Sequence, residues 1–219
     1  MKLKKKKPAM EYVPMPEKAF KKLIAYLASI KKPLPEKLEP YLDEVMKAAI
    51  CRVKHDIHKQ GDVIGKAYYI VRGFMMAYYL DEAGHEHVLR IYSEGEIVAG
   101  NGFMNGSASR YYLKIYDDSF VLEITHAQME TGYRTIEKMD ELARLTIASF
   151  ENKEIEKDEK IRKGGEDSVL HFYLSHRGLL PAGKVIKDAH IASYLHMKIS
   201  SLTRIRASLI KKGLLLGVK

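Results

Sequence analysis

The chain has 219 residues, enough for one large domain or two modest ones, and its 46% hydrophobic and 30% charged residues exclude a wholly disordered protein. The single cysteine, Cys51, excludes an intramolecular disulfide framework, a four-cysteine iron–sulfur cluster and a cysteine-rich zinc module. The uncharged run at residues 73–80 is too short to span a membrane, and no apolar stretch follows the basic N-terminus. We therefore expect a cytoplasmic protein with neither a signal peptide nor a membrane partner.

The net charge of +9 is unevenly distributed along the chain. Residues 1–7 hold five lysines and no acid, and residues 168–219 hold nine basic side chains against one acid, which gives that segment a charge of +8. Residues 8–167 consequently carry a net charge of −4. This asymmetry favours a polyanionic partner for the C-terminal part, most commonly nucleic acid, over the alternative of a merely solvated basic face.

The first 126 residues divide into a tail, two helices and a β-rich region. We expect a basic, flexible tail over residues 1–15, and apolar spacing predicts a helix over residues 19–30 and a second, short one over residues 41–46. Six short strands are then expected within residues 50–55, 68–71, 74–80, 87–92, 111–116 and 120–124. Because glycine and acidic turn residues separate them, they predict an antiparallel barrel or sandwich.

The chain becomes helical again from about residue 127. Apolar side chains recur at steps of three and four residues, in the order Ile136, Met139, Ala143, Ile147 and Phe150. Such a narrow stripe is typical of a long helix that faces an equivalent helix in a homodimer. Packing onto the chain's own β-region is the alternative. The highly charged residues 151–167, which contain Gly164-Gly165, predict the end of this helix and a hinge.

Two short helices joined by about four residues are expected near the C-terminus. Asp188 can cap the first helix, and the second begins at Lys198 or Ser200. The small Ala192 allows the two helices to cross closely, and the expected contacts between them come from Ile191, Leu195, Leu202 and Ile205. Because the second helix is basic, the pair predicts a helix-turn-helix that binds double-stranded DNA.

Six residues of this segment are candidates for DNA contacts. Ser200, Ser201 and Arg204 lie near the start of the second helix on its predicted outward face, where serine can bond to base edges or phosphate and arginine can bind guanine with two hydrogen bonds. The other three are the basic residues Lys187, Lys198 and Arg206, which we expect to contact phosphates and so to position the protein without reading sequence.

The order of these elements resembles the Crp/Fnr family of bacterial transcription regulators. The residues that carry the resemblance are Gly61-Asp62, the run at residues 69–73, Gly84 with Glu86, Gly95-Glu96, and residues 186–209 with Arg204 at the base-contacting arginine. The C-terminal block is similar to the branch found in Bacteroidetes.

The resemblance implies an α+β fold. It places an antiparallel β-barrel or jelly roll of the cyclic nucleotide-binding type at residues 16–126, a long dimerisation helix with a hinge at residues 127–165, and a helix-turn-helix at residues 166–219. A shortened wing is expected after Gly213, and His196 stands where the family usually has a turn glycine. Histidine tolerates the left-handed backbone better than most residues, so the turn can survive.

The resemblance also implies an effector site, a homodimer and contact with RNA polymerase. Relatives that bind cyclic AMP use a Gly-Glu pair for the ribose and an Arg-Ser pair for the phosphate, and the matching residues are Gly100, Asn101, Ser109 and Arg110. Asn101 lacks the charge of the expected acid, and Arg110 is displaced by one position, which on a strand reverses the direction of its side chain. We expect an effector other than cyclic AMP, or none, and an open polar cleft near Arg110 would indicate a ligand.

Other functions are less well supported by the sequence. His85 and His87 lie on one side of a strand, as in metal-dependent cupin enzymes, but Glu94 is too far along the chain to complete such a site, so a polar hairpin end is favoured. His55 and His58 form a turn cluster, and haem held by one histidine stays open. No catalytic arrangement is recognised, so we assign no enzyme activity, metal or cofactor. The main alternative is a ligand-sensing protein that has lost DNA binding.

Overall fold

The computed structural model of the chain describes residues 8–180 and 183–215, apart from the side chain of Asn101. These residues form two compact units. Of the described residues, unit 1 comprises residues 8–76 and 92–147, and unit 2 comprises residues 77–91, 148–180 and 183–215. Within the described ranges, no helix is both long enough and apolar enough to span a membrane.

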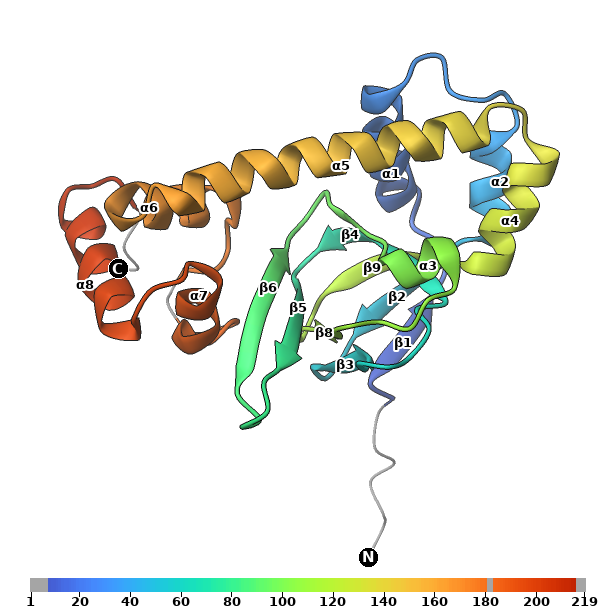
Figure 1. The fold of residues 1–219 in the computed structure, drawn as a ribbon. Coiled ribbons are helices and arrows are strands. Elements are labelled where there is room, and N and C mark those ends of the chain that lie inside the picture. Colours follow the sequence, from blue (N-terminus) through green and yellow to red (C-terminus); the bar gives the residue numbers. More distant parts are fainter. Residues whose placement is uncertain (1–7, 181–182, 216–219) are drawn as a thin grey trace, which may run out of the picture. The chain divides into compact units, whose positions relative to one another are not determined.

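The elements follow one another along the chain as Figure 1 shows. The strands are β1 (Met10–Val13), β2 (Lys47–Cys51), β3 (His55–His58), β4 (Lys66–Arg72), β5 (Met75–Leu80), β6 (Glu86–Tyr92), β7 (Ile97–Val98), β8 (Tyr112–Ile115) and β9 (Phe120–Thr125). The helices are α1 (Glu17–Ile30), α2 (Leu38–Val45), α3 (Asn101–Asn105), α4 (His126–Thr135), α5 (Met139–Arg162), α6 (Gly165–Ser175), α7 (Asp188–Tyr194) and α8 (Ile199–Lys211).

The strands form two sheets, in the orders β1-β2-β9-β4-β7 and β3-β8-β5-β6. In the first sheet every pairing is antiparallel, with Tyr69 of β4 opposite Leu122 of β9. The architecture is the predicted α+β fold with antiparallel strand pairing. Five of the six expected strands are present, but the prediction of one strand within residues 50–55 was wrong, because residues 52–54 separate β2 from β3 and these two strands belong to different sheets. The tail prediction was wrong for residues 10–13, because this segment forms β1 and pairs with β2.

The glycine at the end of β4 shows why turn residues punctuate this region. Gly73 has a φ of +96°, in the region that side chains disfavour, and a Cβ there would lie 2.6 Å from the Cα of Ser119. The Ser119 hydroxyl sits in the same place and bonds to both the backbone N–H and the C=O of Phe74. Glycine is therefore required at position 73 for two reasons: the positive φ disfavours a side chain, and Ser119 occupies the place that a Cβ would take.

The core of unit 1 lies where α1, α2 and the start of α5 meet strands β4 and β9. Leu38 and Leu122 are fully buried in it, and Leu23 and Leu142 are almost so. Thr125 begins α4 with a capping box, in which its hydroxyl accepts a bond from the backbone N–H of Gln128 and its own N–H donates to the Gln128 side chain.

The long helix predicted across the apolar stripe is divided at residues 136–138. Ile136 ends α4, and Lys138 has a φ of +65°, which breaks the helix before α5 begins at Met139. Ile136 and Met139 are 6% and 3% exposed and belong to the core of unit 1. The stripe therefore begins by packing onto its own unit, which is the alternative that the sequence left open. The predicted break at the glycine pair is confirmed, since α5 ends at Arg162 and α6 begins at Gly165.

Unit 2 holds the C-terminal helices, in which α8 packs against α6 and α7 (Figure 1). Its core contains the fully buried Ile191 and Leu202 together with Phe172 and Ile186. Asp188 is the first residue of α7 rather than its cap, because the helix begins after Lys187. Residues 185–186 lie in bends and not in the short extended piece that the sequence indicated.

Candidate DNA-binding and effector sites

Helices α7 and α8 form the predicted helix-turn-helix. Ala192 is 2% exposed, and its carbonyl accepts a hydrogen bond of 3.0 Å from the N–H of Met197 as the chain turns. His196 has a φ of +51°, so it adopts the left-handed conformation expected of the turn glycine. The four predicted contact residues between the helices, Ile191, Leu195, Leu202 and Ile205, are all buried.

The first turns of α8 present most of the candidate DNA contacts to solvent. Ser200 and Arg204 are exposed, Ser201 is half-buried, and Lys198 is the exposed residue before the helix. Lys187 is also exposed, at the residue before α7. The structure thus brings these five side chains into one helix-turn-helix with a cationic surface.

Arg206 does not have the phosphate-contacting role predicted for it. It is 7% exposed, and its guanidinium donates two hydrogen bonds, of 2.8 and 2.7 Å, to the carboxylate of Asp188 and one of 2.8 Å to the hydroxyl of Tyr173. The bonds to Asp188 raise the pKa of the Arg206 guanidinium further. The physical reason is the helical period: residues two apart in α8 point to nearly opposite sides, so Arg204 faces out when Arg206 faces in.

Strand β6 anchors α6 and α7 within unit 2 by polar contacts that the sequence did not indicate. Glu86 contacts His190 of α7 at 2.6 Å, and the N–H of Val88 donates to the hydroxyl oxygen of Ser193 at 3.0 Å. The buried ring of His176, just after α6, lies 3.1 Å from the carbonyl oxygen of Ile91. These contacts join residues about 85 to 105 positions apart in the sequence, and no local pattern would have revealed them.

The candidate effector residues differ in burial, and the space directly beside Gly100 is occupied. Gly100 precedes α3, and a Cβ on it would lie 2.6 Å from the Tyr111 hydroxyl oxygen and 2.6 Å from Ile64 Cδ1. Ser109 is 6% exposed, and its hydroxyl donates to the backbone carbonyl of Tyr111 at 2.7 Å. Arg110 is exposed. The side chain of Asn101 lies outside the described residues, although its backbone begins α3.

The predicted dimer stripe is mostly occupied within the chain. Ile136 and Met139 are in the core, Ala143 lines a cavity of unit 1, and the ring of Phe150 lies 5.0 Å from the Arg90 guanidinium carbon in unit 2. Ile147 lines the same cavity, but 39% of its surface is exposed. A dimer contact through α5 would therefore need other residues of this helix besides Ile147.

The histidine pairs do not form a metal centre. His85 and His87 both contact the carboxylate of Asp81, at 3.2 and 2.9 Å, and the bond to His87 is the largest of the contacts that lower the pKa of this carboxyl. His55 lies near the backbone of Val53, and burial lowers the pKa of His58. In residues 8–180 and 183–215, no cluster of three or more His, Cys, Asp or Glu side chains could hold a metal ion.

The wing prediction cannot be followed to its end, because residues 216–219 lie outside the described part of the chain. Before them, α8 ends at Lys211, and the N–H of Leu214 returns to the carbonyl of Leu209. Leu215 is buried at 4% exposure.

The comparisons with known proteins fit this geometry. A family model for the cyclic nucleotide-binding domain matches residues 53–135, whereas a search of curated proteins found no match. Among solved structures, FixK2 from Bradyrhizobium japonicum is similar with a TM-score of 0.62 at 18% identity, covering 80% of this chain and 90% of that one. A putative cyclic nucleotide binding protein from Ruegeria pomeroyi gives 0.64 at 17% identity, covering 91% and 90%.

The regulator CLP from Xanthomonas campestris is similar with a TM-score of 0.56 at 17% identity, covering 84% of this chain and 95% of that one. At these identities the likeness establishes the fold alone. The chain therefore contains a segment that matches the cyclic nucleotide-binding domain, in an α+β fold shared with these three proteins.

Proposed function

We propose that the protein is a sequence-specific DNA-binding transcription regulator of the Crp/Fnr type. The observation that carries this proposal is the orientation of α8, whose first turns expose Ser200 and Arg204 while Leu202 and Ile205 are buried. A recognition helix needs one buried face and one exposed face, because the buried face packs against the rest of its domain while the exposed face enters the major groove. CLP, which shares the fold, is a c-di-GMP-responsive global regulator that links cell–cell signalling to virulence gene expression, and this supports a regulatory role by analogy.

The charge of the C-terminal segment supports the same proposal. Its only acid, Asp188, is already neutralised by the buried Arg206, so the remaining eight basic side chains of residues 168–219 include the exposed Lys187, Lys198 and Arg204. Lysine and arginine side chains that contact phosphate release counterions from DNA, which makes affinity strongly dependent on salt. Arg204 is the residue that we expect to contact a base, and the two lysines are expected to contact phosphates.

We further propose that the protein acts as a homodimer through α5. Besides Ile147, this helix exposes Leu145 and Ile155, at 39% and 58%. Leu145, Ala148 and Ile155 follow one another at helical spacing and share one side of α5. Two copies joined in this way would place two recognition helices on successive major grooves of a near-palindromic site, with RNA polymerase as a further partner on the DNA.

The effector of this regulator is proposed not to be cyclic AMP. Tyr111 and Ile64 fill the space beside Gly100, and the Ser109 hydroxyl is engaged with the backbone of its own loop. A cyclic nucleotide would have to displace these contacts. Asn101 in place of an acid also lacks the charge that would strengthen a bond to a ribose hydroxyl.

The proposal is tested by selecting binding sites from random DNA and then measuring affinity by fluorescence anisotropy at 50 and 200 mM salt. We expect a near-palindromic consensus and an affinity that falls by about 10³-fold or more over this range, for at least six phosphate contacts in the dimer. Selection of no consensus, together with absent or salt-independent binding, would overturn the proposal. That result would leave the alternative, a ligand-sensing protein without DNA binding.

A further inference from the structure

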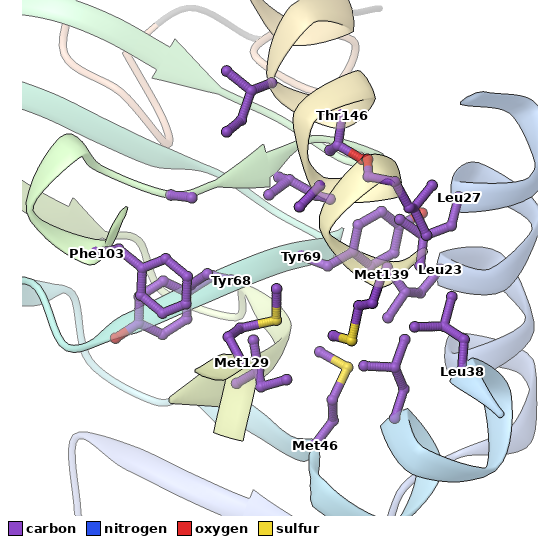
Figure 2. Close-up of a pocket in the computed structure, with 18 of the residues that line it drawn as sticks. Leu23, Leu27, Leu38, Met46, Tyr68, Tyr69, Phe103, Met129, Met139 and Thr146 are labelled. Atoms are coloured by element: carbon purple, nitrogen blue, oxygen red, sulfur yellow. The ribbon is translucent and has the colours of Figure 1, made fainter. Parts of the chain in front are cut away.

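Unit 1 contains an apolar cavity of about 130 Å³ (Figure 2). Helices α1, α2, α3, α4 and α5 and strand β4 all contribute side chains to its wall, and Figure 2 shows Tyr68, Phe103, Tyr69, Met129 and Met139 around the open space. The cavity is partly open to solvent, since the exposed residues Ala99, Met104 and Ile147 are among those that line it. An apolar cavity of about 150 Å³ can hold a benzene molecule, which sets the scale of a fitting ligand.

The chemistry of the wall restricts what can enter. None of the lining residues carries a charge, and apart from Thr146 and three tyrosines all have purely apolar side chains or methionine. A charged ligand, including any nucleotide phosphate, would lose its hydration there without gaining a counter-ion. The cavity therefore favours an uncharged and largely apolar molecule.

One lining residue supplies an unused polar atom. In the part of the chain that the structure describes, the hydroxyl of Tyr133 is the buried side-chain oxygen or nitrogen that lacks a hydrogen-bond partner. A buried hydroxyl without a partner is destabilising, and native structures seldom keep one without a reason. Burial also raises the pKa of Tyr133, so the group stays protonated at neutral pH and can donate a bond to a ligand.

The wall is also adaptable. Four of the ten methionines of the chain line the cavity, namely Met46, Met104, Met129 and Met139. Methionine has an unbranched, flexible side chain with a polarisable sulfur that contacts aromatic rings favourably. Such a wall can close around a small ring without a fixed complementary shape.

From these observations we infer that the cavity is a binding site for a small, uncharged, mainly apolar molecule of about the size of one aromatic ring, which carries one polar atom that bonds to the Tyr133 hydroxyl. Of the predicted effector residues whose side chains are described, Gly100, Ser109 and Arg110 are not among those that line the cavity.

A role for this ligand as the effector rests on the proposed function. Met139, Leu142, Ala143, Thr146 and Ile147 line the cavity from the first part of α5, and the same helix continues into unit 2 (Figure 1). A ligand that binds one position of α5 better than another would shift the population of the two positions. Binding itself does not depend on this role.

The inference is tested by NMR of the full chain with ¹³C-methyl methionine, titrated with phenol and with toluene, which replaces the hydroxyl by a methyl group. We expect saturable shifts of Met46, Met104, Met129 and Met139, whereas Met75, Met76 and Met197, which do not line the cavity, should stay unchanged. Phenol should bind more tightly than toluene. The absence of saturable shifts at the four lining methionines, or equal shifts at all methionines, would overturn the inference.

Two kinds of variant sharpen the test. Tyr133→Phe should reduce phenol affinity about two- to tenfold and leave toluene affinity unchanged, as expected for the loss of one hydrogen bond. Tyr79→Phe, at an exposed tyrosine outside the cavity, is the matched control and should change neither affinity. Ala143→Leu should abolish binding of both by filling the space, and Ala99→Leu, at an exposed lining residue, provides the same test should the first variant fail to fold. Unchanged phenol affinity in Tyr133→Phe would contradict the role of the hydroxyl.

Failure of this inference and failure of the proposed function give different results. If phenol shifts the lining methionines but the protein binds no DNA, the cavity site stands and the regulator proposal fails. If the protein selects a DNA consensus but no lining methionine shifts, the regulator stands and the cavity inference is wrong.

Discussion

The contacts that stabilise the interior of unit 1 differ in kind from those that stabilise the interior of unit 2. Unit 1 combines an antiparallel sheet with a broad apolar core, which contains the cavity lined by Tyr133. Unit 2 has short helices, and polar side chains fix their positions: Arg206 with Asp188 and Tyr173, and Glu86 with His190. The comparison shows that directional polar contacts add to the apolar core in positioning the short helices of unit 2, whereas the helices of unit 1 pack mainly through buried apolar surface.

The largest effect is expected from Arg206→Ala. Arg206→Ala removes one partner of a partly buried ion pair and leaves the Asp188 carboxylate, whose side chain is 25% exposed, without its counter-ion. The free energy of unfolding of unit 2 should fall by about 2–3 kcal/mol, less than for a fully buried pair. Chemical denaturation followed by circular dichroism measures the change, with the exposed Lys211→Ala as the control. The double variant Asp188→Leu with Arg206→Met should recover most of the loss. A stable Arg206→Ala protein that has lost DNA affinity would instead restore Arg206 as a DNA contact.

The proposed dimer is tested by Ile155→Glu, which introduces a charge at the most exposed apolar residue of α5. We expect the dimer dissociation constant to rise at least tenfold in sedimentation velocity, because a carboxylate is costly to bury in an apolar contact. Glu156→Gln, at the exposed neighbouring position, is the control. An unchanged dimer, or a wild-type monomer at micromolar concentration, would remove α5 from the interface.

A smaller effect is expected in unit 1 from Thr125→Ala. The loss of the capping box at the start of α4 should lower the free energy of unfolding by about 1 kcal/mol. Thr131→Ala, at an exposed position inside the same helix, should change it less, and equal effects of the two substitutions would show that the cap contributes nothing specific.

The reactivity of the Cys51 thiol measures the burial of this residue in unit 1 and requires no substitution. It is fully buried, and burial raises the pKa of its thiol from 9.0 to about 11. Because only the thiolate reacts, alkylation at pH 8 should be much slower in the folded protein than in denaturant, and it should accelerate as the pH approaches 11. Equal rates in the folded and unfolded protein would contradict the burial of this residue.

Sequence pattern predicted the fold class, five of the six expected strands and the helix-turn-helix, because each depends on local periodicity and turn residues. It also predicted that His196 could replace the turn glycine, and the positive φ confirms this. Sequence pattern failed where tertiary contacts determine the role of a residue. Arg206 was predicted to be a surface cation, but Asp188 of α7 lies beside it and forms a salt bridge with it. Ile136 and Met139 were predicted to belong to a dimer stripe, but the helix breaks at Lys138 and both residues are buried in the core of unit 1. The cavity lined by Tyr133 had no signal in the sequence, since it arises from side chains of eight separate elements.

The most direct test of the account compares Arg204→Ala with the wild type on the selected DNA site and on random DNA. If Arg204 contacts a base, the free energy of binding to the selected site should weaken by about 1–3 kcal/mol, and the base preference should relax at one position in each half-site. The affinity for random DNA should change much less. Equal losses on both DNAs would show that Arg204 contacts phosphate only. No loss on either would contradict the assignment of α8 as the recognition helix.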